Sequence, residues 1–265
     1  KNMLAAYEKS YNDRDKKESS DLVEEYIQHY LQGSPIPGIA AEYKMAKDFL
    51  PAIGIEDVNA IADILKGDQN VFAFIMGPDK ADVKLPSPQV LLQDIALAEK
   101  ADVKPYEEKV IDTELLTVLP KAGKVTGKKN NALTGTTELT LSNGVSVTLK
   151  PTDFKNDEIL MSASRYGGTS NYSQPDKYNA AYALPVVNAM GYGSFSPTDL
   201  QKALSGKTIS ATPFIGATTE GINGSSTVKD LETMFQLAYL KLTEPRKDSS
   251  LFTSFVQKNK AQLAL

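Results

Sequence analysis

His29 is the only histidine in this chain of 265 residues, and there is no cysteine. Zinc hydrolases ordinarily hold the metal with two or three histidines, and serine and cysteine hydrolases need a histidine base beside the nucleophile. The chain therefore cannot assemble most hydrolytic sites from its own residues. His29 lies between Tyr26 and Tyr30, with two glutamates close by. This setting favours a structural position at the edge of an amphipathic helix over a metal ligand.

Three glycine-containing segments have the residue types of ligand-binding loops. Gly206–Thr208 resembles the end of a phosphate-binding loop, but Gln201 stands where that loop needs a glycine. A glycine that ends a helix is the favoured interpretation. Gly167–Gly168 and Gly191–Gly193 do not complete a dinucleotide-binding pattern. We expect both to be turns.

Two further groups of side chains lie close together in the sequence. Asp153, Asp157 and Glu158 have the types of a catalytic carboxylate pair, but we expect them to be solvated acids of a turn. Tyrosines concentrate in the segment that follows, and they suit adaptable contacts with a peptide as well as packing within the fold. These tyrosines are Tyr166, Tyr172, Tyr178, Tyr182 and Tyr192.

The composition is that of a soluble globular protein, with 41% hydrophobic and 23% charged residues. A net charge of −4 and a pI near 5.2 argue against a nucleic-acid partner. No apolar run approaches the roughly 20 residues that span a bilayer. The first residues lack the apolar core of a signal peptide and begin inside a helical pattern without a methionine. We expect the chain to be a piece of a longer protein.

The first part of the chain predicts helices followed by a strand. Apolar residues at helical spacing follow an Asp21–Glu24 capping pair up to Gly33, and a second helix runs from Ile39 to Pro51. A third, from about Glu56 to Gly67, is expected to bury its apolar side. The run Asn70–Met76 predicts a well-buried strand.

The segment 78–134 is different, because it shows little periodicity after a short helix that Ser87 and Pro88 begin and that extends to about Lys100. Most of it is predicted to be an extended linker. From Thr137, alternating apolar residues around Asn143–Gly144 predict a hairpin with a type I′ turn. Glu158–Ser164 predicts a third strand.

The last part of the chain predicts four helices and one strand, which together give an α+β fold with helices against an antiparallel sheet. Pro185 is expected to kink or split the first of these helices. The predicted elements are a helix over Tyr178–Met190, a helix from Ser196 to Gly206, a strand over Thr208–Ala217, a helix capped by Thr227 and a helix that begins at Asp248.

Several segments resemble the insulinase-type (M16, pitrilysin-like) zinc peptidases in their long bacterial form. That family has homologous modules arranged as two halves around a chamber. Leu31–Pro51 and Val71–Lys80 resemble the end of the second module, and Leu139–Ser170, Gly191–Lys207 and Ile222–Asp248 resemble the start of the third. The resemblance implies that residues 1–85 close the second module, 86–134 link the halves, and 135–265 open the third module.

The resemblance also implies where a zinc site would lie. A catalytic module holds zinc through an inverted HxxEH on a helix, and its glutamate is the general base. The corresponding helix here reads AAYALPVVNAMG, with Ala183 and Val187 at the histidine positions and Val186 at the glutamate position. Such side chains neither bind zinc nor accept a proton. No catalytic, cofactor-binding or metal-binding residue is expected in this chain, and zinc is expected in the full-length parent.

Two functions related to the resemblance remain open from the sequence, beside a third in which the chain is an unrelated α+β binding module. The chain is either the non-catalytic middle of a zinc metalloendopeptidase, which forms chamber wall and substrate-binding surface, or part of an inactive homologue that binds peptides or acts as a scaffold subunit. Expected partners are peptides or unfolded polypeptides and the other modules of the same protein, with no nucleic acid and no membrane span. The expected location is the periplasm or cell envelope of a bacterium.

Overall fold

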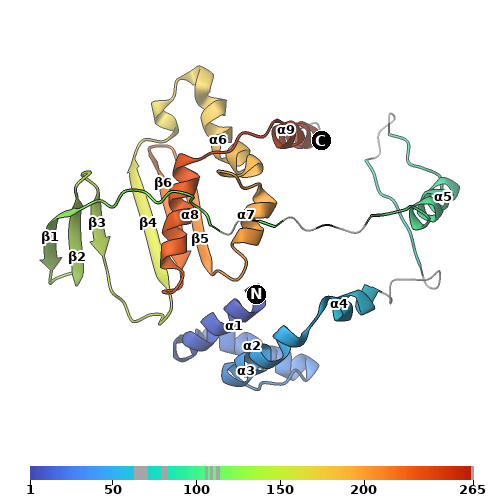
Figure 1. Cartoon of the computed structure of the whole chain (residues 1–265), viewed down its shortest axis with the longest axis horizontal. Helices are drawn as coiled ribbons and strands as arrows, with labels where there is room; N and C mark the ends of the chain where they lie inside the picture. The colour runs from blue at the N-terminus through green and yellow to red at the C-terminus, as the bar shows by residue number, and fades with distance from the viewer. Residues whose placement is uncertain (63–70, 79–82, 105–106, 108–109, 112–113, 264–265) are drawn as a thin grey trace. The chain divides into compact units, whose positions relative to one another are not determined.

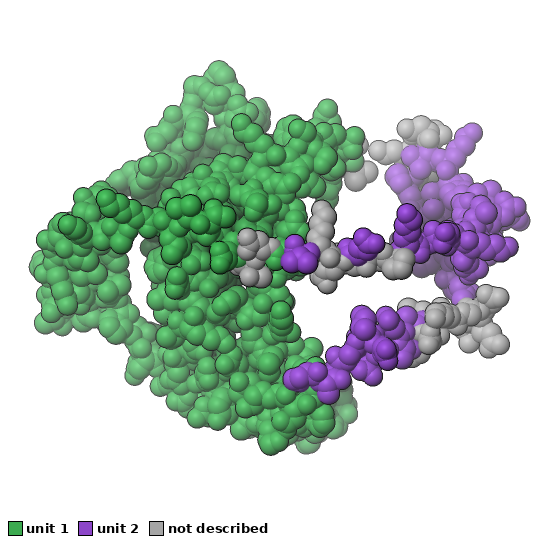
Figure 2. All heavy atoms as spheres, in the orientation of Figure 1, with its two compact units in different colours: residues 1–50, 111–265 green, residues 51–110 purple. Residues whose placement is uncertain are grey.

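The computed structural model describes residues 1–62, 71–78, 83–104, 107, 110–111 and 114–263. They form two compact units, coloured separately in Figure 2. One unit contains residues 1–50 and 111–265, and the other contains residues 51–110. The expected boundaries at 85 and 134 stay predictions, since compactness alone does not identify modules.

Helices and strands follow one another as an α+β fold, as predicted (Figure 1). The helices are α1 (Asn2–Asn12), α2 (Ser19–Gln32), α3 (Ile39–Phe49), α4 (Ile55–Ala62), α5 (Pro88–Glu99), α6 (Lys177–Met190), α7 (Pro197–Ala203), α8 (Leu231–Thr243) and α9 (Ser249–Leu263). The strands are β1 (Val125–Asn131), β2 (Thr136–Leu141), β3 (Ser146–Leu149), β4 (Ile159–Tyr166), β5 (Ile209–Ile215) and β6 (Thr219–Ser226).

The main core lies between α8 and an antiparallel sheet in the order β4-β6-β5. Helix α8 packs on β5 and β6, and Figure 1 shows it crossing one face of this sheet. Met234 is fully buried and Leu240 is 1% exposed, so solvent does not reach these side chains of α8. Burial of large side chains of this kind is the principal favourable term of folding.

Strand β6 was missing from the sequence prediction, which gave one strand where the structure has the β5–β6 pair. Its sequence is rich in small residues, and glycine disfavours strands in isolation. Packing reverses this preference here. A Cβ on Gly221 would lie 2.0 Å from the carbonyl oxygen of Ala163, and one on Gly224 would lie 3.0 Å from the sulfur of Met234. The glycines let the neighbouring strand and the core approach β6 closely.

A second antiparallel sheet has the order β1-β2-β3 and contains the predicted hairpin. The predicted type I′ turn is wrong. Thr140 pairs with Ser146, and the N–H of Gly144 donates to Leu141 O, which gives a three-residue loop with Gly144 at φ +84°. The linker prediction missed β1, whose Lys-Lys-Asn-Asn sequence has no alternation and which forms because β2 supplies a pairing edge.

The N-terminal helices lie at the predicted positions, and the apolar stripe of α2 is largely exposed. Helix α2 begins at Ser19, before Asp21, and no side chain caps it, so the expected capping pair does not form. Gly33 ends it in the left-handed conformation, as predicted. Its apolar stripe is largely exposed, since Tyr30 and Leu31 are 87% and 68% exposed. Helix α3 instead packs on α1, with Tyr11 and Tyr43 rings 5.2 Å apart.

The unit of residues 51–110 holds α4 and α5. Ser87 caps α5 as predicted, because its Oγ accepts a hydrogen bond from Val90 N. The apolar residues of α4 are exposed, contrary to expectation. The predicted buried strand is also wrong over the described residues Val71–Met76, which have no regular structure and are exposed. An apolar β-rich run needs a neighbouring strand, and the described residues of this unit include none. Asn70, Leu65 and Gly67 lie outside the described residues.

The C-terminal helices follow the sequence closely. Helix α6 passes through Pro185 without a break, so the predicted split does not occur. Ser196 caps α7 and Asp248 caps α9 by accepting backbone N–H groups, as predicted. The predicted cap of α8 is one turn early, because the N-cap residue is Asp230 and not Thr227.

Replacing Leu240 by Ala should lower the free energy of unfolding by about 2–5 kcal/mol, because it leaves a cavity in the α8 core. Leu242→Ala is the matched control on the same helix, since that side chain is 58% exposed, and it should cost less than about 1 kcal/mol. Urea unfolding followed by circular dichroism measures both. Equal midpoints for the two variants would show that α8 does not pack on the sheet by this face.

Candidate functional site

Helix α6 is the helix to which the family resemblance assigns the zinc positions of a catalytic module. Ala183, Val186 and Val187 are all partly buried, and Val187 packs against the main core. Among the residues that the structure describes, no group of three His, Cys, Asp or Glu side chains could hold a metal ion. The residues on α6 therefore do not fit zinc, and the only histidine lies on a different helix.

His29 lies in the last turn of α2 and is exposed. Its Nδ1 lies 2.7 Å from the carbonyl oxygen of Ser34, and its own carbonyl accepts the N–H of Gly33. Both contacts close the C-terminal end of the helix. This position agrees with the structural role predicted for His29.

The glycine segments serve as turns. Lys207, the cation of the apparent phosphate loop, has its Nζ 3.2 Å from Oδ1 of the buried Asp230. Thr208 N also donates to Asp230, at 3.0 Å. A buried carboxylate at this place repels a phosphate. A Cβ at Gly168 would lie 2.4 Å from the carbonyl oxygen of Gly216, so only a glycine lets the two backbone segments approach this closely.

The sequence predicted that the acids near residue 157 all lie in solvent, and this prediction is wrong for one of them. Asp153 and Glu158 are exposed, but Asp157 is 9% exposed. Its Oδ2 accepts a hydrogen bond from Asn12 Nδ2 at 2.8 Å, and its Oδ1 accepts one from Val228 N at 2.9 Å. Asp157 therefore links the end of α1 to the segment that leads into α8. A partner distant in sequence, which no local pattern reveals, accounts for the error.

Asp13 completes this contact from the other side. Its Oδ1 accepts hydrogen bonds from the backbone N–H groups of Asn156 and Asp157, at 2.8 and 2.9 Å. Its Oδ2 forms an ion pair with Lys9 at 2.9 Å. We call Asn12, Asp13, Asn156, Asp157 and Val228 the polar joint. It holds the N-terminal helices against the β4–α8 part of the same unit, and its donors and acceptors are matched.

Asp230 anchors the neighbouring turn and is 1% exposed. Burial raises the pKa of its carboxyl, but hydrogen bonds from Thr208 N, Lys207 and Thr227 outweigh burial, so the pKa lies below its ordinary value. The pKa of Asp13 is lowered in the same way, since the donors Lys9, Asp157 N and Asn156 N outweigh burial. Both carboxylates are therefore stabilised in the charged form, as structural acids rather than proton donors.

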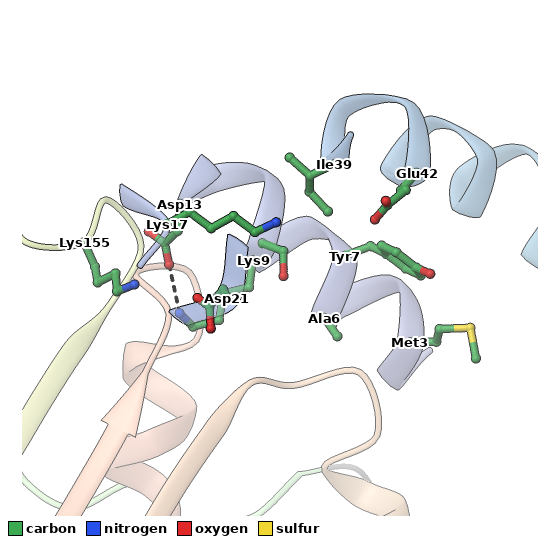
Figure 3. Close-up of a pocket in the computed structure, with 11 residues that line it drawn as sticks. Met3, Ala6, Tyr7, Lys9, Asp13, Lys17, Asp21, Ile39, Glu42 and Lys155 are labelled. Carbon is green, nitrogen blue, oxygen red and sulfur yellow. Dashed lines mark hydrogen bonds and ion pairs between the residues drawn. The ribbon is translucent and has the colours of Figure 1, made fainter. Parts of the chain in front are cut away.

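A charged cavity of about 520 Å³ lies beside the polar joint, between α1, α2 and α3 (Figure 3). Lys9, Lys17 and Lys155 line it together with Asp13, Asp21 and Glu42. Lys9 and Lys17 form ion pairs with Asp13 and Glu25, and Lys155 donates to the carbonyl oxygen of Lys16. The cavity offers neither a net positive nor a net negative set of groups for a charged ligand.

An apolar hollow of about 520 Å³ lies beside α8. Its wall combines residues of α8 with residues of β4, β6 and the segment before β1, so no local sequence pattern predicts it. The exposed fractions of Phe235, Tyr239 and Leu242 are 53%, 39% and 58%. The hollow suits an apolar side chain. It is lined by Leu116, Leu119, Pro120, Met161, Ile222, Glu232, Phe235, Gln236, Ala238, Tyr239 and Leu242.

The five tyrosines divide into two groups. Tyr192 is 3% exposed and belongs to the core, where its hydroxyl donates to Asn188 Oδ1 at 2.6 Å. The other four are at least 40% exposed and lie in β4, in the segment before α6 and in α6 itself. They are Tyr166, Tyr172, Tyr178 and Tyr182. The structure thus keeps four of the five available for contacts outside the described residues.

Asp157→Ala should lower the free energy of unfolding by about 1–3 kcal/mol, because Val228 N and Asn12 Nδ2 lose their acceptor in two partly buried hydrogen bonds. Asp153→Ala removes an exposed acid of the same turn and should change it by less than about 0.5 kcal/mol. Chemical denaturation at neutral pH measures the free energy of unfolding of both variants. A destabilisation no larger than that of the control would mean that Asp157 does not carry the joint.

The lowered pKa of Asp230 predicts a pH dependence. A carboxyl whose pKa is lower in the folded than in the unfolded state stabilises the fold above its ordinary pKa, and this contribution disappears as the pH falls through the folded value. The free energy of unfolding should therefore fall from about pH 5 to pH 3, and less steeply in Asp230→Asn. Asp153→Asn should keep the original slope. An unchanged slope in Asp230→Asn would contradict the lowered pKa.

No protein-family model matches the chain. A curated zinc protease of Arabidopsis thaliana, described as PQQL-like, is 29% identical over 241 residues, which are 91% of this chain and 23% of that protein. The solved periplasmic protease PqqL from Escherichia coli covers 98% of this chain with a TM-score of 0.52 at 18% identity, and the match takes up 29% of PqqL. The ferredoxin protease FusC, solved as a mutant with Arabidopsis ferredoxin, covers 91% with a TM-score of 0.49 at 24% identity, over 28% of that chain.

The chain spans about a quarter of the length of these proteins. In the part of the chain that the structure describes, no helix has both the length and the apolar content to cross a membrane. The likeness to PqqL shows the fold, with its helices and antiparallel sheets. Together with the similarity to the PQQL-like zinc protease, it confirms the resemblance to the M16 zinc proteases.

Proposed function

We propose that this chain is a non-catalytic internal region of a longer zinc metalloendopeptidase, in which it forms chamber wall and substrate-binding surface. One observation carries the proposal. The chain is similar to a zinc protease over 91% of its length, yet α6 has Ala183, Val186 and Val187 where zinc ligands and a general base would stand. The zinc, the base and the attacking water then belong to an upstream module.

The exposed apolar surfaces support an assembly with other modules. The stripe of α2 and the run Val71–Met76 are apolar and largely exposed. Exposed apolar area of this extent is unfavourable in water and marks surfaces that other protein covers. On this proposal residues 1–85 complete one module, 86–134 link two halves, and 135–265 begin the next module.

The substrate is a peptide or unfolded polypeptide. The apolar hollow beside α8 suits an apolar side chain, and Tyr178 and Tyr182 offer rigid aromatic surface with a polar tip. Neither feature includes a nucleophile or a paired base. We place the protein in the periplasm or cell envelope, in line with the periplasmic location named for PqqL.

A second candidate is an inactive homologue that binds peptides or acts as a scaffold subunit. The apolar residues on α6 favour it equally, because they would also be found if no module kept the zinc site. An HxxEH followed by a downstream glutamate in the residues that precede this region would select the first proposal. Its absence would select the second.

The purified chain should contain no stoichiometric zinc and should not hydrolyse a quenched fluorescent peptide, because its described residues include no group of side chains that could hold a metal ion. Elemental analysis and a fluorescence assay measure the two quantities. The longer protein is the control, in which zinc and chelator-sensitive hydrolysis are expected together. Zinc with turnover in the chain alone would contradict the proposal. If the longer protein contained no zinc and hydrolysed no peptide, the inactive homologue would be favoured.

A further inference from the structure

Strand β1 is the outer strand of the sheet β1-β2-β3 and pairs on one side only, with β2. Figure 1 shows no element beyond it. Every second residue of such an edge directs its N–H and C=O away from the sheet. The register of β1 shifts between Val125 and Gly127, so the regular alternation begins at Gly127. Residues 127–131 therefore present backbone donors and acceptors that the described residues leave for another strand.

The chain around this edge is basic, although the whole protein is acidic. Residues 121–150 contain five lysines and one glutamate, a net charge of +4, whereas the chain carries −4. Lys121, Lys124, Lys128 and Lys129 are exposed and make no ion pair with any described residue. Lys129 lies opposite Glu138 on β2, without an ion pair, and Lys128 lies opposite Leu139.

Lysines on an edge strand ordinarily prevent the strand from pairing with copies of itself. Two β1 strands brought together would place Lys128 and Lys129 near the same residues of the other copy, and like charges across strands are unfavourable. The same lysines attract a strand of opposite charge. The edge therefore discriminates by charge among the strands that could pair with it.

We propose that the outer edge of β1 binds an extended acidic segment of a polypeptide as an additional strand. Main-chain hydrogen bonds supply the pairing, and Lys128 and Lys129, which project to opposite faces, select two consecutive acidic residues. This proposal rests on the proposed function, because the bound polypeptide is a substrate only if the chain belongs to a peptidase.

A polypeptide fits this edge better than a nucleic acid does. The free groups of a strand repeat every second residue, with the spacing of another strand rather than of phosphates. A long nucleic acid would also be repelled by the protein as a whole, because the net charge of the protein is −4. A short acidic strand contacts mainly the local lysines, because charges beyond about 10 Å are screened at moderate salt.

The test uses the 265-residue chain and a labelled, end-blocked peptide as long as β1, with a Glu-Glu pair between Val and Thr residues. Fluorescence anisotropy should show binding that weakens with added salt. Hydrogen exchange of residues 125–131 should slow when the peptide is present. Peptides with Gln-Gln or Lys-Lys in place of Glu-Glu should bind less tightly, in that order.

The variant Lys128→Gln with Lys129→Gln should weaken binding about five- to tenfold, which corresponds to the loss of two exposed ion pairs. Lys258→Gln with Lys260→Gln is the matched control. Those lysines lie on α9, are exposed and have no ion pair among the described residues, so their neutralisation should leave binding unchanged. An equal effect of both variants would mean that only net charge matters and would overturn the proposal.

Two other outcomes would also overturn it. Absence of binding by every peptide would leave the lysines as protection of an edge and nothing more. Tighter binding of a single-stranded oligonucleotide of equal charge would replace the polypeptide by a nucleic acid. Neither result bears on zinc content or hydrolysis in the longer protein, so failure here and failure of the proposed function are distinguishable.

Discussion

Buried aspartates that accept backbone N–H groups hold the larger unit of this protein together. Asp157 joins the end of α1 to the start of the α8 segment, and Asp13 returns the contact to the backbone at Asn156 and Asp157. A buried carboxylate is costly unless its lone pairs are satisfied, and a satisfied one fixes geometry more strictly than apolar contact does. These bonds, together with the hydrogen bond from Gly206 N to Asn2 and the ion pair between Lys229 and Glu8, position the N-terminal helices in this unit.

The hydrogen bonds to these buried acids also indicate that the acids are structural rather than catalytic. Titratable side chains with shifted pKa, such as those of Asp13 and Asp230, are bound to donors that fix them in one charge state. Such groups stabilise a fold, but they do not exchange protons in a reaction. On α6, Ala183, Val186 and Val187 are partly buried, and Val187 packs against the core. The buried acids of this unit therefore serve its packing.

The sequence predicted the elements whose signals are local. Gly33 ends α2, Ser87 and Ser196 cap their helices, and the alternation around Asn143–Gly144 gives the hairpin. It failed where tertiary contacts decide. Strand β6 contains glycines that are unfavourable until another strand and Met234 pack against them, and β1 acquires its conformation from β2.

The candidate surfaces were harder to predict for the same reason. Asp157 was expected in solvent because its partners, Asn12 and Val228, lie far away in the sequence. The hollow beside α8 combines four separate segments, so no spacing reveals it. The apolar stripe of α2 follows the predicted helical periodicity, but periodicity does not say whether the covering partner is part of the same chain.

Anomalous diffraction at the zinc absorption edge, from crystals of the longer protein, tests the central claim most directly. Zinc is expected at side chains outside residues 1–265, with none near α6. Anomalous density bound by side chains of residues 1–265 would contradict the account, because it would make this region part of the catalytic site.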